Sequence, residues 1–159
     1  MPLMIMPEGH TSNGTHLCSF KRGAFNAEKR VLPIYMKYTF SGFSTDYALM
    51  DDLPLAILTL CWIWGGLKCE VGVLPVFQPN EYMFEKFKNK GSERWEAYAW
   101  CVRDAMAKAG GFEVTDIPVR AKLAYYQYLN GRIDIKDFEN KSVDQIVQDY
   151  NEIRAKKDK

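Results

Sequence analysis

The sequence predicts an α/β domain followed by a helical C-terminal extension. Two patterns carry this prediction. Short segments rich in apolar, β-branched and aromatic residues recur before residue 78, and segments with helical spacing occupy most of the chain after it. The chain has 159 residues, of which 47% are hydrophobic and 14% aromatic, so it is long enough for one domain with a buried core and too apolar to be disordered.

Three segments of the first half are predicted to be strands. The first is the short apolar run at residues 3–6. The second covers residues 31–40, with Pro33 near its start, and is rich in β-branched and aromatic side chains. The third covers residues 69–77, where alternate side chains share one face until a proline ends the pattern, in the order Cys69, Val71, Val73 and Pro75.

An uncharged segment at residues 53–67 separates the second and third predicted strands. It has 15 residues, whereas a helix that spans a bilayer needs about 20. A helix buried in the core or against a partner fits this length. A helix in the membrane interface also fits, because Trp62 and Trp64 near its end suit the headgroup boundary.

Four helices are predicted after residue 79, each with a recognisable start. Glycine ends the first three. The expected ranges are 80–91 capped by Asn80, 92–111 capped by Ser92, 117–131 with Pro118 in its first turn, and 142 onward, where Ser142 and Gln145 form a capping-box pattern. The second helix has an apolar stripe made of Trp95, Ala99, Val102, Met106 and Ala109.

Charge and cysteine content exclude some classes of function. The 21 basic and 20 acidic side chains leave a formal net charge of +1, and no basic stripe interleaves with aromatics, so no nucleic-acid partner is expected. The four cysteines lie far apart without metal-like pairing, which favours free thiols over disulfides. They are Cys18, Cys61, Cys69 and Cys101.

The loop "MPEGHTSNG" at residues 6–14 is the main candidate for chemistry. A glycine-containing turn after an apolar run lets backbone N–H groups point at one spot, which favours an anion. "SFKRGAF" follows and brings Lys21 and Arg22 next to Gly23, where a cation can close on a phosphate. Taken alone, such turns and basic pairs are common on protein surfaces.

A longer stretch carries a family resemblance. "MPEGHTSNGTHLCSFKRGAFNAEKRVLPIYMKY" resembles the third and fourth sequence blocks of the glycerolipid acyltransferase family, with the pattern Phe-Pro-Glu-Gly-Thr-x-Ser-Asn-Gly, then Phe-Lys-x-Gly-Ala-Phe, then Val-x-Pro-Val. The Ser-Asn-Gly form is similar to the lysophosphatidylcholine (lysophospholipid) acyltransferase branch. "CEVGVLPVFQPNE" and "GGFEVTDIP" are similar to that branch's last strand and to the end of its acyltransferase domain.

The resemblance covers residues 3–118 and implies a domain organisation. Residues 1–118 would be the C-terminal half of an acyltransferase-like domain, a mixed sheet with helices, and residues 119–159 a helical extension. The implied reaction transfers an acyl group from acyl-CoA, as co-substrate, to a lysophospholipid hydroxyl, with no bound cofactor. The implied acceptor- and phosphate-binding residues are Glu8, Gly9, His10, Thr11, Ser12, Asn13, Gly14, Lys21 and Gly23.

The family's catalytic motif is not found in this sequence. In the family, the histidine of a His-x-x-x-x-Asp motif takes the proton of the acceptor hydroxyl. Here Thr15 stands five residues after His10, and Lys21 five residues after His16, so we assign no catalytic residue. His10 replaces the family's usual threonine. It lies beside Glu8, which could orient it as a base, but a non-catalytic loop histidine is the favoured interpretation.

No metal site is expected either. A site built from His10, His16 and Cys18 lacks the four ligands of closed zinc sites. The segment "NGRIDIKDFE" resembles the second half of a calcium-binding loop. Counting Gly131 as its sixth position places Tyr126 and Tyr128 where calcium needs carboxylates, so we expect no calcium binding.

Two hypotheses for function follow. The first is a non-catalytic, acyltransferase-derived lipid-binding or structural subunit at a membrane, whose truncated sheet exposes apolar surface that a protein partner or a membrane covers. The alternative is the acceptor-binding half of an active acyl-CoA:lysophospholipid acyltransferase, with its catalytic half on another chain or missing from this sequence. In both cases we expect an intracellular, membrane-associated protein, at the endoplasmic reticulum by resemblance or in an organellar membrane complex.

Overall fold

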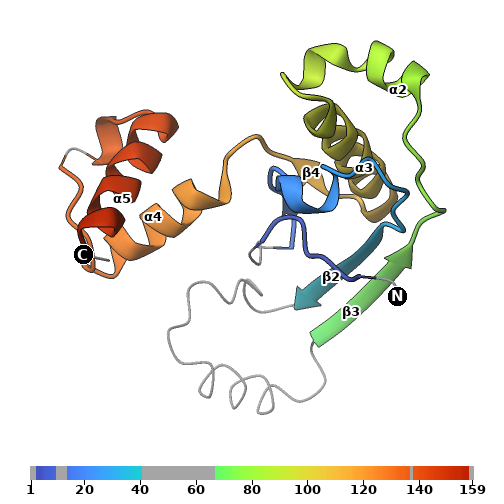
Figure 1. The fold of residues 1–159 in the computed structure, drawn as a ribbon. Helices are drawn as coiled ribbons and strands as arrows, with labels where there is room; N and C mark the ends of the chain where they lie inside the picture. The colour runs from blue at the N-terminus through green and yellow to red at the C-terminus, as the bar shows by residue number, and fades with distance from the viewer. Residues whose placement is uncertain (1–2, 10–13, 41–66, 137, 158–159) are drawn as a thin grey trace. The chain divides into compact units, whose positions relative to one another are not determined.

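The structure, a computed structural model, describes residues 3–9, 14–40, 67–136 and 138–157. The chain divides into two compact units, Met1–Thr115 and Asp116–Lys159. Helices and small sheets occur together, which confirms a mixed α/β composition (Figure 1). The uncharged segment predicted as a helix at residues 53–67 lies outside the described residues, apart from Leu67 at the start of β3.

An antiparallel hairpin confirms the second and third predicted strands. β2 (Ile34–Phe40) pairs with β3 (Leu67–Val73) in a register that places Ile34 opposite Val73. An isolated bridge between Val31 and Phe77 extends the pairing beyond both strands. β3 ends shortly before Pro75, as expected for a residue without a backbone N–H group.

The prediction of a strand at residues 3–6 is wrong. These residues have no strand pairing, and Leu3 and Met4 are 82% and 79% exposed. Apolar character alone does not make a strand, because the ladder needs a neighbouring segment. A short parallel pair forms instead between β1 (His16–Leu17) and β4 (Glu113–Val114). The described residues thus hold two separate two-stranded sheets in place of one mixed sheet.

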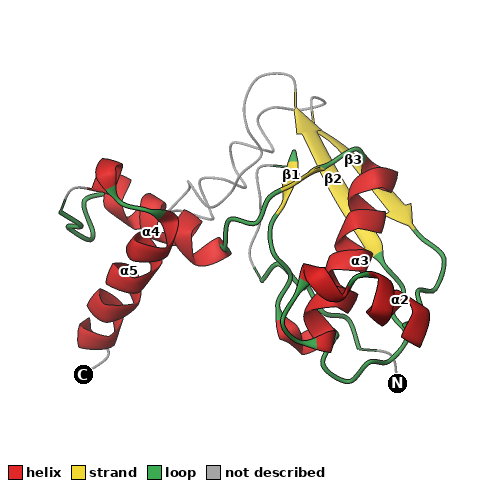
Figure 2. Cartoon of the chain, turned by 90° about the horizontal axis from the view of Figure 1, so that it is seen from above, coloured by secondary structure: helices red, strands yellow, loops and turns green. Residues whose placement is uncertain are grey.

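The two faces of the β2–β3 hairpin have different surroundings. On one face, the buried Tyr35 ring packs edge-on against Phe112 with centroids 5.5 Å apart, and Lys37 Nζ donates to the carbonyl of Gly110 over 2.9 Å. This face lies against the end of α3 (Arg94–Gly110), as Figure 2 shows. The opposite face carries apolar side chains that are about half exposed or more, namely Ile34, Met36, Val71 and Val73.

The structure confirms one of the two helix caps predicted for residues 80–111. Asn80 caps α2 (Glu81–Lys86) as predicted, since its Oδ1 accepts from the backbone N–H of Met83 over 2.8 Å. The helix ends earlier than predicted, at Lys86, and a 3₁₀ turn, η3 (Lys88–Lys90), continues the chain. The predicted Ser92 cap of α3 is wrong.

Glu93 takes the capping position of α3 instead of Ser92. Its side chain and that of Glu96 form a reciprocal capping box. Ser92 still contributes, because its backbone N–H and its hydroxyl both donate to Glu96 Oε2. Gly111 ends the helix as predicted, with a φ of 62° in the left-handed region that favours glycine.

α3 forms the centre of the core in the first unit. Tyr98 is fully buried and packs edge-on against Phe25 at 5.2 Å, just after the 3₁₀ turn η1 (Arg22–Ala24). The Tyr98 hydroxyl donates to the carbonyl of Lys29 over 2.8 Å. In the predicted apolar stripe, the buried residues are Ala99, Val102 and Met106, whereas Trp95 is half-buried and Ala109 is exposed.

The second unit has a core of its own. α4 (Val119–Leu129) begins later than predicted, with Pro118 at its N-cap position and not in its first turn. Gly131 adopts a φ of 64° after the helix, as the sequence predicts. The predicted capping box of α5 (Val143–Lys157) is confirmed, since the Ser142 N–H donates to Gln145 Oε1 over 3.0 Å. One cluster of buried side chains forms this core: Ala124, Ile133, Ile135, Ile146 and Phe138, which begins η4 (Phe138–Asn140).

Candidate functional site

The Glu-Gly turn is closed by the segment that follows the loop. The Gly9 N–H donates to the Met6 carbonyl over 3.1 Å, and Gly9 has a φ of 70°. The chain then returns to the turn: the Lys21 N–H donates to the Pro7 carbonyl over 2.7 Å, and the Cys18 N–H donates to Glu8 Oε1 over 2.8 Å. Residues 7–9 and 18–21 are therefore joined by one backbone bond and one carboxylate bond.

The side chain of Lys21 lies directly over Gly9. A Cβ atom added at Gly9 would approach Lys21 Cε to 2.7 Å and would come closer still to Nζ. The positive φ favours glycine at position 9, whereas the crowding could be relieved by a movement of the flexible Lys21 side chain. The arrangement brings the ammonium group of an exposed lysine against the backbone of the turn, so any anion held at the turn meets a positive charge.

The structure brings together three of the residues implied as acceptor-binding, namely Glu8, Gly9 and Lys21. Gly14 adopts a φ of 79°, which is consistent with a turn that needs glycine. Gly23 lies in η1, and a side chain there would meet nothing within 4 Å, so space does not require glycine. His10, Thr11, Ser12 and Asn13 lie outside the described residues.

His16 has a partner that the sequence reasoning missed. Its Nε2 lies 3.1 Å from Glu113 Oε2, across the β1–β4 register, and its Nδ1 lies 2.7 Å from the Thr15 hydroxyl. The pairing joins the strand that leaves the loop to the strand that follows α3. Sequence spacing does not predict it, because only the parallel pairing of β1 with β4 brings the two residues together.

Arg103 is the second feature that the sequence reasoning missed. It is 4% exposed, and its Nη1 donates to the Ser19 hydroxyl over 3.3 Å and to the Thr115 carbonyl over 3.0 Å. A signal for it exists in the sequence. Arg103 stands four residues after Ala99 and three before Met106, so it interrupts the apolar stripe of α3 with a charge.

The described cysteines are free thiols, as predicted for Cys18, Cys69 and Cys101, whereas Cys61 lies outside the described residues. Within those residues, no group of three or more His, Cys, Asp or Glu side chains could hold a metal ion. Tyr126, at the first position counted for a calcium loop, is buried, and Tyr128, at the third, stacks on Phe138 at 4.5 Å. Across the described ranges, no helix is long and apolar enough to cross a membrane.

Comparison with known proteins decides the family. The chain is 34% identical over 140 residues to the lysophospholipid acyltransferase LPEAT1 of Arabidopsis thaliana, and this match covers 87% of the chain. It is 36% identical over 114 residues to lysophosphatidylcholine acyltransferase 1 of Rattus norvegicus, covering 72% of the chain. The chain is a lysophospholipid acyltransferase homologue. The family resemblance read from the sequence is thereby confirmed.

This lysophospholipid acyltransferase homologue spans only part of its relatives. Its match covers 33% of the Arabidopsis protein and 20% of the rat protein. The lysophospholipid acyltransferase LPCAT4 of Mus musculus gives a similar match, 32% identical over 117 residues and 20% of its length. No family model matches the sequence, and no solved structure matches it.

Proposed function

We propose that this chain binds the glycerol-phosphate part of a lysophospholipid at the Glu8–Lys21 loop and does not transfer an acyl group by itself. The observation that carries the proposal is the side chain of Lys21, an exposed residue whose ammonium lies over Gly9 at the turn. The names of the relatives support the class of acceptor, since they are lysophospholipid and lysophosphatidylcholine acyltransferases.

The local electrostatics favour a phosphate at this turn. A lysine ammonium acts as a point charge toward phosphate oxygens. The neighbouring Glu8 carboxylate would repel an anion, but its Oε1 is bound to the Cys18 N–H over 2.8 Å and so is directed at the returning backbone. Holding the carboxylate there leaves Lys21 as the charge that an incoming phosphate meets at Gly9.

The catalytic base is proposed to come from outside the printed sequence. Neither His10 nor His16 begins a His-x-x-x-x-Asp motif. The ring of His16 is bonded to Thr15 on one side and Glu113 on the other. The chain therefore serves either as a non-catalytic lipid-binding subunit or as the acceptor-binding part of an active acyltransferase. Because its ligand is a membrane amphiphile, both roles belong at a membrane surface, with the endoplasmic reticulum as the predicted location.

A protein partner forms part of this proposal. The outer face of the β2–β3 hairpin exposes Met36, Val71 and Val73 by 48%, 58% and 63%, and apolar surface of this kind is typical of an interaction site. We propose that a polypeptide supplying the histidine covers this face. The mixed sheet with helices that the family resemblance implies supports this, because in such folds helices cover the faces of the sheet.

Binding of lysophosphatidylethanolamine and of sn-glycerol 3-phosphate to the purified chain tests the proposal. Lys21→Met should weaken both by about tenfold or more, the effect of losing one charge-assisted hydrogen bond of about 1.5–3 kcal/mol. Lys29→Met is the matched control, because Lys29 is an exposed lysine of the same segment and should leave both affinities unchanged. Equal affinities of Lys21→Met and the unaltered chain would refute the proposed site.

An acyl-transfer assay separates the two roles. The chain alone should show no transfer from acyl-CoA to lysophospholipid. Addition of the part of the Arabidopsis relative that this chain does not match should restore turnover if the chain is half of an enzyme, and should leave binding without turnover if it is a subunit. Turnover by the chain alone that is lost in His10→Ala or His16→Ala would overturn the non-catalytic assignment.

A further inference from the structure

A buried arginine lies behind the candidate loop. Arg103 is the one charged side chain among the buried residues of the described part of the chain. It lies on the packing face of α3, close to Met106, which is 7% exposed. Removing a guanidinium from water is costly, and an apolar side chain of similar length usually fills such a position as well or better. We therefore examine which groups the buried guanidinium holds in place by hydrogen bonds.

Two hydrogen bonds of Arg103 show groups that it holds in place. Its Nη1 donates to the Ser19 hydroxyl over 3.3 Å and to the Thr115 carbonyl over 3.0 Å. Thr115 follows β4 and donates its own N–H to the Leu17 carbonyl over 3.1 Å. Arg103 thus joins the end of β4 to the residues that follow β1. The contact is directional, which apolar packing is not.

Ser19 lies in the sequence between Cys18 and Lys21, the two residues that contact the Glu-Gly turn. The N–H of Cys18 holds the Glu8 carboxylate, and Lys21 both bonds to Pro7 and covers Gly9. A shift of Ser19 would therefore be passed to both contacts through one or two backbone units. The Glu113 N–H donates to the Thr15 carbonyl over 2.9 Å, and this bond holds the residue just before β1.

We propose that Arg103 is a positioning residue for the anion-binding loop. It holds Ser19 in place, so that Cys18 and Lys21 keep their hydrogen bonds to the Glu-Gly turn. The identity of the ligand in this inference rests on the proposed function, whereas the contacts of Arg103 do not depend on that function. Arg103 acts through Ser19 and does not touch the acceptor. Loss of the guanidinium is expected to loosen the loop while α3 keeps its place in the core.

Affinity for sn-glycerol 3-phosphate, measured by calorimetry on the full chain, is the first readout. Arg103→Met should lower affinity by about tenfold, and Arg103→Lys should recover part of the loss because an ammonium can still donate to Ser19. Ser19→Ala should weaken binding too, and adding it to Arg103→Met should cause little further loss, since the two residues act as one unit.

Two control variants separate positioning from general destabilisation. Lys108→Met removes a cation from the same helix, where Lys108 is 76% exposed and pairs with Asp104 over 2.6 Å. Met106→Ala removes buried volume beside Arg103 and should lower the melting temperature. Both should bind within about twofold of the unaltered chain. A loss in Met106→Ala equal to that in Arg103→Met would overturn the inference.

Amide hydrogen exchange provides a readout that needs no ligand. The Cys18 and Lys21 amides are bonded across the loop, so Arg103→Met should speed their exchange more than that of amides inside α3. Uniform acceleration, or none, would refute the positioning role. If the unaltered chain fails to bind glycerol phosphate, the proposed function fails, and selective exchange at these two amides still decides the role of Arg103.

Discussion

Burial gives the described thiols different chemistry. Cys101 lies on α3 and is 7% exposed, and burial raises the pKa of its thiol to about 11. Cys69 lies on the outer face of β3 and is exposed, whereas Cys18 is partly buried beside the loop. Because the thiolate is the reactive form, both access and the pKa make Cys101 the slowest of the three to react.

Thiol labelling with a disulfide reagent at neutral pH checks this ranking. Cys69→Ser should remove a fast phase of the reaction, because its thiol is exposed and needs no unfolding to react. Cys101→Ser should leave the native reaction unchanged and remove one thiol only after the protein is unfolded in denaturant. A fast phase that disappears in Cys101→Ser would contradict the structure of α3.

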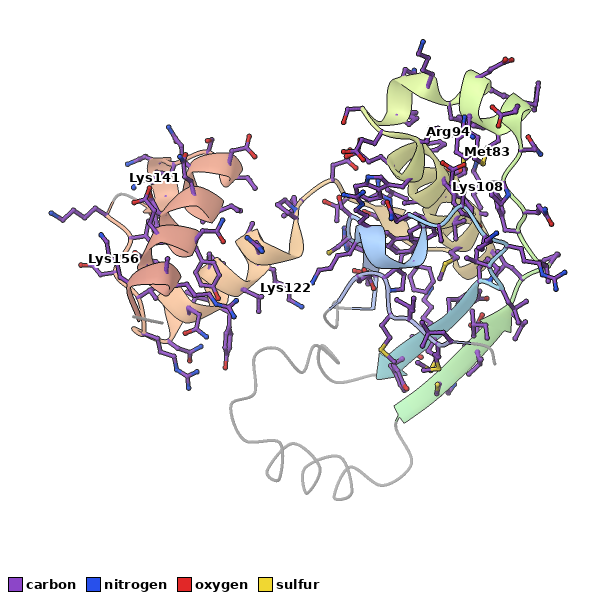
Figure 3. All side chains as sticks on the ribbon, viewed as in Figure 1. Met83, Arg94, Lys108, Lys122, Lys141 and Lys156 are labelled. Atoms are coloured by element: carbon purple, nitrogen blue, oxygen red, sulfur yellow. The ribbon has the colours of Figure 1, made fainter. Side chains whose placement is uncertain are left out.

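Charged side chains hold the start of α3 against α2 and Glu28. Arg94 donates from Nε to Glu28 over 3.0 Å and from Nη2 to Glu81 over 2.9 Å, and its guanidinium lies 3.8 Å from the centre of the Phe84 ring. Figure 3 labels Arg94 at the start of α3 and Met83 on α2, the helix that also carries Glu81. The Arg94 hydrogen bond lowers the pKa of the Glu81 carboxyl, so this contact weakens when acid protonates it.

The capping box predicts an acid-dependent stability at the same point. The backbone N–H of Glu93 and the groups of Ser92 lower the pKa of the Glu96 carboxyl from its ordinary value of 4.5. A carboxyl whose pKa is lower in the folded state stabilises the fold above its unfolded pKa. That contribution is lost as the pH falls from about 4.5 through the folded value.

Glu96→Gln should therefore flatten the fall in unfolding free energy below about pH 4.5, because the amide can still accept the cap bonds but does not titrate. Urea unfolding measured from pH 7 down to pH 3 checks this. Glu85→Gln, in an exposed carboxylate of α2, is the matched control and should keep the slope of the unaltered chain. An unchanged slope in Glu96→Gln would show that the capping box does not contribute.

The outer face of the β2–β3 hairpin exposes an apolar patch. Apolar side chains alternate along both strands, and the register places them on one face, with Ile34 opposite Val73 and Met36 opposite Val71. Each is at least 48% exposed. Leaving such a patch in water gives no hydrophobic stabilisation, so covering it would favour association.

Met36→Glu tests the proposal that a polypeptide covers this face. The substitution should leave thermal stability and glycerol phosphate affinity close to those of the unaltered chain, because Met36 is 48% exposed and lies on the face opposite Tyr35. It should abolish association with the complementary part of the Arabidopsis relative in size-exclusion chromatography. Thr39→Glu, at an exposed position of the same strand, serves as control. Retained association in Met36→Glu would refute this assignment of the face.

Sequence and structure agree best where the deciding contacts are local. The Asn80 cap, the Gly111 and Gly131 stops and the Ser142–Gln145 box depend on residues within one turn of a helix, so the sequence predicts them. The errors at the start of α3 and at residues 3–6 have different causes. Glu93 and Ser92 are adjacent acceptors competing for one cap, and a strand needs a partner elsewhere in the chain.

The family, the hairpin strands, the Glu-Gly turn and several helix caps and stops can be predicted from the sequence, because motifs and caps consist of neighbouring residues. Only the folded chain shows that Lys21 covers Gly9, that Glu113 meets His16 and that Arg103 is buried against Ser19. These contacts join residues far apart along the chain or across a turn. Their geometry depends on how α3 and β4 pack beside the loop, which spacing alone does not specify.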